Sequence, residues 1–90
     1  MNKTRRNAIS VLIEKINNFY IDLADIKEEL EELKAEEEEA LENIPESLQD
    51  TERAEAMQEA LETLEEAINE LDYSMDRLND SADLLEEAIN

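Results

Sequence analysis

The chain has 90 residues, of which 27 are Asp or Glu and eight are Lys or Arg, so its formal net charge is −19. It contains no Gly, Cys, His or Trp, and Pro45 is its only proline. This length fits one domain, and the lack of Gly disfavours tight turns with positive φ. The lack of Cys excludes disulfides and thiolate zinc sites, and the acidity argues against direct binding of nucleic-acid phosphates.

The apolar residues of the first half predict a helix from about residue 4 to 43. When Ile9 is taken as position a of a heptad, the a and d positions follow at alternating steps of three and four, and Glu37 alone among them is charged. Such a repeat is typical of coiled coils. The predicted a and d positions are Ile9, Leu12, Ile16, Phe19, Leu23, Ile26, Leu30, Leu33, Glu37, Ala40 and Ile44.

The segment NIPESLQD then interrupts the repeat, and a turn is predicted over about residues 44–50. Pro45 has no N–H to donate and disfavours helical geometry at the residue before it. We expect the residues after Pro45 to form a short turn of helix, with Leu48 packed over the end of the bundle. Asp50 or Thr51 can cap the following helix, because both side chains accept hydrogen bonds from backbone N–H groups.

A second helix is predicted from about residue 51 to 89, with an a/d seam that has no polar member. The g positions of this helix carry small side chains at every heptad. Small side chains there would let another helix approach closely; the alternative is that alanine and serine are simply neutral flanking residues. The predicted seam is Ala54, Met57, Leu61, Leu64, Ile68, Leu71, Met75, Leu78, Ala82, Leu85 and Ile89. The g positions are Ala60, Ala67, Ser74, Ser81 and Ala88.

Two helices of equal length joined by a short connection predict an all-α fold, an antiparallel two-helix coiled-coil hairpin. Lys27 and Lys34 on the first helix are then expected to reach Asp72 and Glu65 on the second. The predicted register places Leu30 opposite Leu64, Ile26 opposite Ile68, Leu23 opposite Leu71 and Phe19 opposite Met75.

A lone hairpin buries little apolar area, and further apolar residues widen its stripe near the open end, away from the turn. We therefore expect a homodimer that forms a four-helix bundle through that end. The alternative is a monomer whose apolar residues contact a different protein. The predicted contact residues are Val11, Ile13, Tyr20, Ile21 and Leu84.

The residue types argue against an enzyme, a metal site or a cofactor. Without His or Cys, the usual nucleophiles and general bases are missing, and the carboxylates occupy helix positions that water reaches. The glycine-containing calcium loop is also absent. The apolar run Val11–Ile13 is too short for a signal peptide or a membrane span, so a soluble, cytoplasmic protein without membrane contact is expected.

Residues 28–43, EELEELKAEEEEALEN, hold nine glutamates and one lysine. Charged helix faces usually serve solubility, but they normally mix both signs. One interpretation is therefore a mimic of nucleic acid that occupies the basic surface of a nucleic-acid-binding protein, steered by charge. The other is a structural adaptor that binds through its apolar open end. The predicted acidic binding face is Glu28, Glu29, Glu32, Glu36, Glu39, Glu42, Glu62, Glu66 and Glu70.

The segment NIPESLQDTERAEAMQEALETLEEA resembles the turn and second helix of small, acidic coiled-coil hairpin proteins of Gram-positive bacteria and their phages and mobile elements. Phage proteins of this size and acidity include DNA-mimic inhibitors of restriction and CRISPR systems. The resemblance thus implies a protein of the bacterial host cytoplasm with a role in phage counter-defence. It assigns no functional residue.

Overall fold

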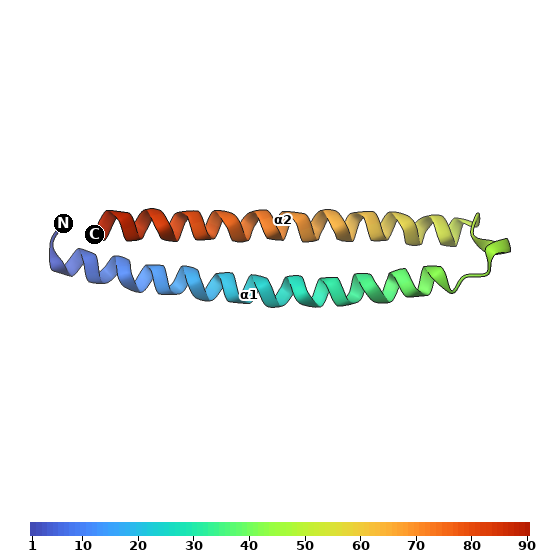
Figure 1. The fold of residues 1–90 in the computed structure, drawn as a ribbon, viewed down its shortest axis with the longest axis horizontal. Helices are drawn as coiled ribbons and strands as arrows, with labels where there is room; N and C mark the ends of the chain where they lie inside the picture. The colour runs from blue at the N-terminus through green and yellow to red at the C-terminus, as the bar shows by residue number, and fades with distance from the viewer.

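The computed structural model describes residues 1–90 as two long helices that run antiparallel, side by side (Figure 1). Helix α1 spans Lys3–Glu42, a short 3₁₀ helix spans Glu46–Leu48, and helix α2 spans Glu52–Ile89. Both termini lie at the same end of the molecule, opposite the turn (Figure 1). The Cα atoms extend over 70 × 15 × 14 Å. The predicted all-α helical hairpin is confirmed.

Helix α1 begins and ends without any residue of positive φ. At its start the side-chain oxygen of Asn2 accepts a hydrogen bond from the backbone N–H of Arg5, at 2.8 Å. At its end the backbone N–H of Asn43 donates to the Glu39 carbonyl. The side-chain amide of Gln49, in the turn, donates to the Leu41 carbonyl in the last turn of the helix at 3.4 Å and to the Ile44 carbonyl at 2.8 Å.

The start of α2 is capped by Thr51, one of the two predicted caps. Its hydroxyl accepts from the Ala54 N–H at 3.4 Å and donates to the Leu48 carbonyl at 2.8 Å. The expected turn of helix after Pro45 is confirmed as the 3₁₀ helix. The prediction that Leu48 packs over the end of the bundle is wrong, because its side chain is half exposed.

The seam of α2 is the predicted one. Its buried residues, Ala54, Ile68, Met75 and Ala82, all belong to the predicted a/d set. The remaining members of that set are half-buried. Because these residues keep a strict seven-residue period, α2 presents one continuous apolar edge to α1 along its whole length.

The seam of α1 differs from the prediction. Its a positions are half-buried as expected, but its second seam column is position e, with Ile13 buried to 6% exposure and Tyr20 half-buried. The predicted d positions face outward instead, at exposures between 46 and 64%. These outward residues are Leu12, Phe19, Ile26 and Leu33. The predicted seam partnerships of Phe19 with Met75 and of Ile26 with Ile68 are therefore wrong, whereas Leu30 and Leu64 are half-buried as expected.

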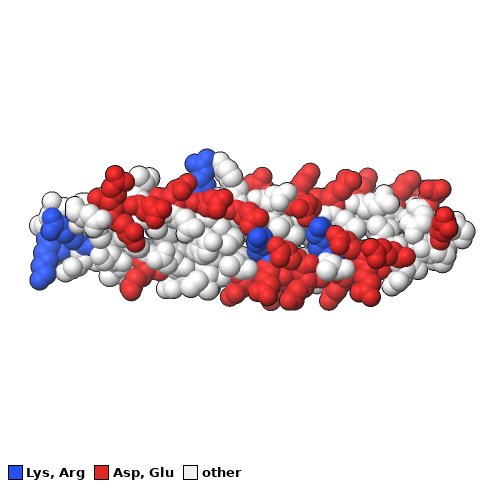
Figure 2. All heavy atoms as spheres, viewed as in Figure 1, with Lys and Arg blue, Asp and Glu red and all other residues white.

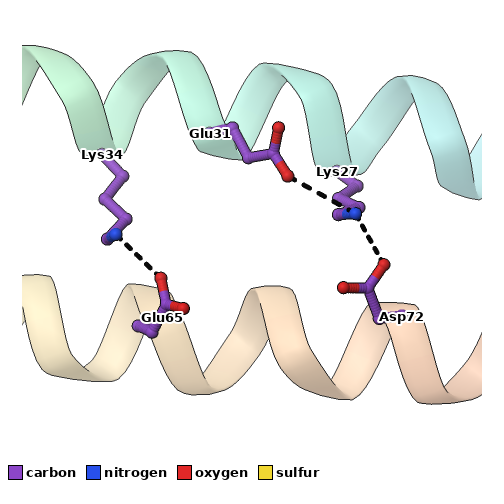
Figure 3. Close-up of polar contacts among 5 residues, drawn as sticks. All are labelled: Lys27, Glu31, Lys34, Glu65 and Asp72. Carbon is purple, nitrogen blue, oxygen red and sulfur yellow. Dashed lines mark ion pairs between the residues drawn. The ribbon is translucent and has the colours of Figure 1, made fainter.

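Two lysines at e positions explain why α1 is turned this way. The Lys27 Nζ lies 2.6 Å from an Asp72 carboxylate oxygen, and the Lys34 Nζ lies 2.8 Å from one of Glu65. Figure 3 shows both side chains reaching from α1 across to α2. These are the predicted ion pairs. The aliphatic stems of Lys27 and Lys34 cover the edge of the seam while their ammonium groups stay in water. Column e of α1 therefore faces α2, and column d is left outside.

Candidate interaction surface

The hairpin has two long faces, one on either side of the seam. One face carries the interhelical ion pairs, and a shallow groove there is lined by Lys34, Glu65 and Asp72 among others. On the other face, a groove between the helices brings Phe19 of α1 next to Ser74 and Leu78 of α2. We call these the lysine face and the apolar face.

The lysine face is held by charge-assisted hydrogen bonds. Lys27 lies between Asp72 and Glu31 of its own helix, whose carboxylate is 3.5 Å from the ammonium (Figure 3). The hydrogen bond with Asp72 is the main cause that raises the pKa of Lys27 above 10.5. The pKa of Lys34 is raised mainly by its hydrogen bond with Glu65. Both ammonium groups are therefore stabilised in their charged form, and the lysine face adds two ion pairs across the seam.

The apolar face combines two columns of different size. The first is the outward d column of α1, and the second is the g column of α2, whose members are all exposed. Residues seven apart lie on the same side of a helix, so the neighbours of Phe19 and Ser74 in their columns share the face of their groove. The columns are Leu12, Phe19, Ile26 and Leu33 on α1, and Ala60, Ala67, Ser74, Ser81 and Ala88 on α2.

The acidic residues of α2 avoid the apolar face. The c and g columns of α2, which border this face, hold only one of the thirteen acidic residues of the helix, Glu70. The same columns hold both of its basic residues, Arg53 and Arg77. The other twelve acidic residues occupy the b, e and f columns, on the remaining sides of the helix. A helix that only needed solubility would have no reason to separate its charges in this way.

Arg77 and Tyr73 form a small polar cluster at the edge of the apolar face. The guanidinium of Arg77 lies 4.8 Å from the centre of the Tyr73 ring and also donates a hydrogen bond to its hydroxyl oxygen. Both residues line the groove next to Phe19. The contact holds two long side chains along the rim of the groove, where they extend its walls.

The predicted acidic face is exposed, but it is split. All nine of its glutamates are exposed. Six lie on the outer side of α1 and three on α2, so they form two acidic edges with the seam between them. A cleft on the α1 edge is lined only by Asp25, Glu28, Glu29 and Glu32. Figure 2 shows acidic groups along both helices, a cluster of basic groups at the end that holds the termini, and further basic groups nearer the middle of the rod.

Most carboxylates in the chain have no basic partner. Ion pairs involve four of them, those of Glu31, Glu38, Glu65 and Asp72. The other 23 of the 27 carboxylates have no Lys or Arg nitrogen within 4.0 Å (27 − 4 = 23). The negative charge is thus left free along the length of the rod.

The residues predicted for an apolar contact at the open end are separated by the structure. Val11, Ile21 and Leu84 are exposed, Tyr20 is half-buried, and Ile13 is buried between the helices. Ile13 is therefore a core residue of the hairpin and cannot contribute its side chain to an outer surface. Leu84 lies in the c column of α2, at the border of the apolar face, while Ile21 lies in the f column of α1, on its outer side.

Sequence reasoning missed the d column of α1 as a separate surface. The signal was present: Ile13, Tyr20 and Leu41 make column e apolar at both ends, and lysines with acidic partners on α2 fill its middle. With a, d and e all able to face a neighbour, α1 has one column more than a single helix can cover.

No three acidic side chains are placed so that they could hold a metal ion. Neither helix has a stretch long and apolar enough to cross a membrane. No protein-family model, curated protein or solved structure matches the chain.

Proposed function

We propose that this chain is a non-enzymatic interaction protein that occupies a basic, nucleic-acid-binding surface of a partner protein. The observation that carries the proposal is the set of 23 carboxylates without a basic partner on a narrow rod. Unpaired like charges destabilise a helix, since each repulsive i,i+4 pair costs a few tenths of a kcal/mol. A partner with clustered Lys and Arg would relieve that repulsion on binding.

The spacing of charge supports mimicry of a nucleic acid. A net charge of −19 over 70 Å is about one charge per 3.7 Å. Two rods side by side over the same length would carry about one charge per 1.8 Å, against about 1.7 Å in duplex DNA. A homodimer in a four-helix bundle is therefore part of the proposal. Phage counter-defence is the setting that the resemblance of the turn and second helix implies.

A capture experiment tests the proposal. The tagged chain is incubated with bacterial lysate, and bound proteins are eluted either with a salt gradient or with duplex DNA. We expect nucleic-acid-binding proteins that elute with modest salt and are displaced by DNA, because contacts between exposed charges are screened within about 8 Å at physiological ionic strength. Capture that survives high salt and is unaffected by DNA would contradict the proposal.

A pair of charge-matched variants separates the effect of the acidic edge of α1 on partner capture from the effect of net charge. The test variant replaces six glutamates by glutamine on the outer side of α1, and the control neutralises six acidic residues on α2 away from its middle. We expect the first variant to lose the captured proteins and the second to keep them. The test positions are Glu28, Glu29, Glu32, Glu36, Glu39 and Glu42, and the control positions are Glu52, Glu55, Glu59, Glu86 and Glu87, with Asp83→Asn as the sixth.

A second candidate function is the structural adaptor. The observation in its favour is that Val11, Ile21 and Leu84 expose more than half of their surface near the open end. An adaptor that binds through them would retain its partner in high salt and lose it on Ile21→Glu or Leu84→Glu. A mimic would keep its partner in both variants.

A further inference from the structure

We propose that the apolar face is a self-complementary interface on which a second copy of this chain packs, with the two turns at opposite ends of the rod. This inference makes the dimer of the proposed function specific and moves it from the open end to a full face. The occupant is a second copy because the surface left uncovered, the spacing of its apolar column and its distribution of charge all fit one.

The hairpin leaves more surface uncovered than one partner of a stable dimer buries. Its accessible surface is 6928 Å² for a mass of 10.4 kDa. A globular protein of that mass exposes about 5,400 Å², so the excess is about 1,500 Å². A typical stable interface buries about 800 Å² on each partner. The apolar column from Leu12 to Leu33 is about 32 Å long, and on a hairpin about 20 Å wide it gives a footprint of about 600 Å².

The apolar column is symmetric about the middle of its helix. Its four large residues, from Leu12 to Leu33, are centred between residues 22 and 23, and so is α1 itself, which spans Lys3–Glu42. A two-fold axis at this point places Leu12 beside the partner copy's position 33, and Phe19 beside the partner copy's position 26. The whole rod then overlaps its copy. Such a self-complementary arrangement is what a two-fold dimer requires.

The charge of α1 favours opposite rather than equal orientation of the two copies. Its first half, residues 3–21, has four basic residues and one acidic residue, a net charge of +3. Its second half, residues 22–42, has two basic and eleven acidic residues, a net charge of −9. Opposed copies bring each positive half against a negative half, whereas copies with their turns together align the two negative halves.

Individual charged residues beside the apolar column of α1 also favour the opposed orientation of the two copies. Lys15 and Glu29 both lie in the g column of α1, and they are almost equally far from its middle. In opposed copies Lys15 therefore comes level with the other copy's position 29. The small g column of α2 fits as well, because α2 of each copy then meets α2 of the other through alanine and serine, which permit close approach of the helices.

The first test is the mass of the chain in solution, with a matched pair of isoleucine variants. Light scattering at about 100 µM should give about 20.8 kDa (2 × 10.4 kDa) for the unmodified chain. Ile26→Glu should weaken the dimer at least about tenfold, because it places a carboxylate in the interface. Ile21→Glu, on the outer side of the same helix, should leave the dimer unchanged. Circular dichroism checks that both variants remain helical.

The orientation is tested with cysteines, of which the natural chain has none. A mixture of Leu12→Cys chains and Leu33→Cys chains should form a disulfide-linked dimer on oxidation. Leu33→Cys chains alone should not, because in opposed copies the two cysteines are about 32 Å apart. A disulfide needs Cα atoms within about 7 Å.

Three results would overturn the inference: a monomeric mass at about 100 µM, equal weakening by Ile21→Glu and Ile26→Glu, or linkage of Leu33→Cys chains as efficient as that of the mixture. The first of these would leave the charge-dependent capture of a partner untouched. Conversely, a dimer that captures no nucleic-acid-binding protein would overturn the proposed function and leave the interface standing.

Discussion

Ile13 and Leu12 are neighbours in α1 whose burial is the reverse of the heptad prediction, so their alanine variants test the observed seam. Ile13 is 6% exposed and Leu12 is 49% exposed. Ile13→Ala removes three buried carbon atoms and leaves a cavity, which should cost about 3 kcal/mol. Leu12→Ala removes as many atoms at half the burial, so at about 0.8 kcal/mol per buried carbon it should cost about 1 kcal/mol.

Thermal unfolding followed by circular dichroism at 222 nm measures the difference. For a chain of this size Ile13→Ala should lower Tm by about 15 °C and Leu12→Ala by about 5 °C. The comparison is made at about 2 µM and at about 200 µM, because stability gained by association grows with concentration. The Ile13→Ala loss should be similar at both, whereas the Leu12→Ala loss should grow at the higher concentration, where the dimer forms. Equal losses at about 2 µM would contradict the observed seam, and a larger loss for Leu12→Ala would show that the helices meet through columns a and d.

Two further predictions concern the lysine face and the turn. Raised lysine pKa values mean that the ion pairs stabilise the fold fully below pH 10.5, the ordinary lysine value, and that this contribution is lost as the pH rises through the raised values. Between about pH 9 and about pH 12, the urea midpoint of unfolding should therefore fall less for the Lys27→Met/Lys34→Met double variant than for a Lys3→Met/Lys15→Met control. An equal fall in both variants would show that the ion pairs of Lys27 and Lys34 do not stabilise the fold. Thr51→Ala should lower the free energy of unfolding by about 1 kcal/mol, because it removes the cap of α2. Asp50→Ala should change it by less than about 0.5 kcal/mol. A larger effect of Asp50→Ala than of Thr51→Ala would mean that Asp50 is the cap.

The helical elements could be read from local patterns because their causes are local. The seven-residue period of apolar side chains marks both helices, and Pro45 ends the first of them through its own covalent geometry. The ion pairs of Lys27 with Asp72 and of Lys34 with Glu65 could also be predicted, since an antiparallel hairpin with a short turn allows few registers.

The rotation of α1 about its own axis could not be read in the same way. From Ile9 to Leu41, columns a, d and e of α1 are apolar or carry a lysine with an apolar stem, apart from Glu37, so two different seams satisfy its sequence. The choice depends on α2, whose Glu65 and Asp72 receive the lysines on one side of the seam and whose g column offers only small side chains from Ala60 to Ala88 on the other. That preference exists only when the two helices are placed together.

The amino-acid sequence by itself determined that this chain forms two acidic helices folded back on each other, because period, proline and charge act within a helix or across one turn. Only the tertiary structure decided that Ile13 is buried while Leu12, Phe19, Ile26 and Leu33 stay outside. The physical reason is that a helix with three apolar columns can turn only two of them toward one neighbour. Which column remains free is set by the side chains of that neighbour.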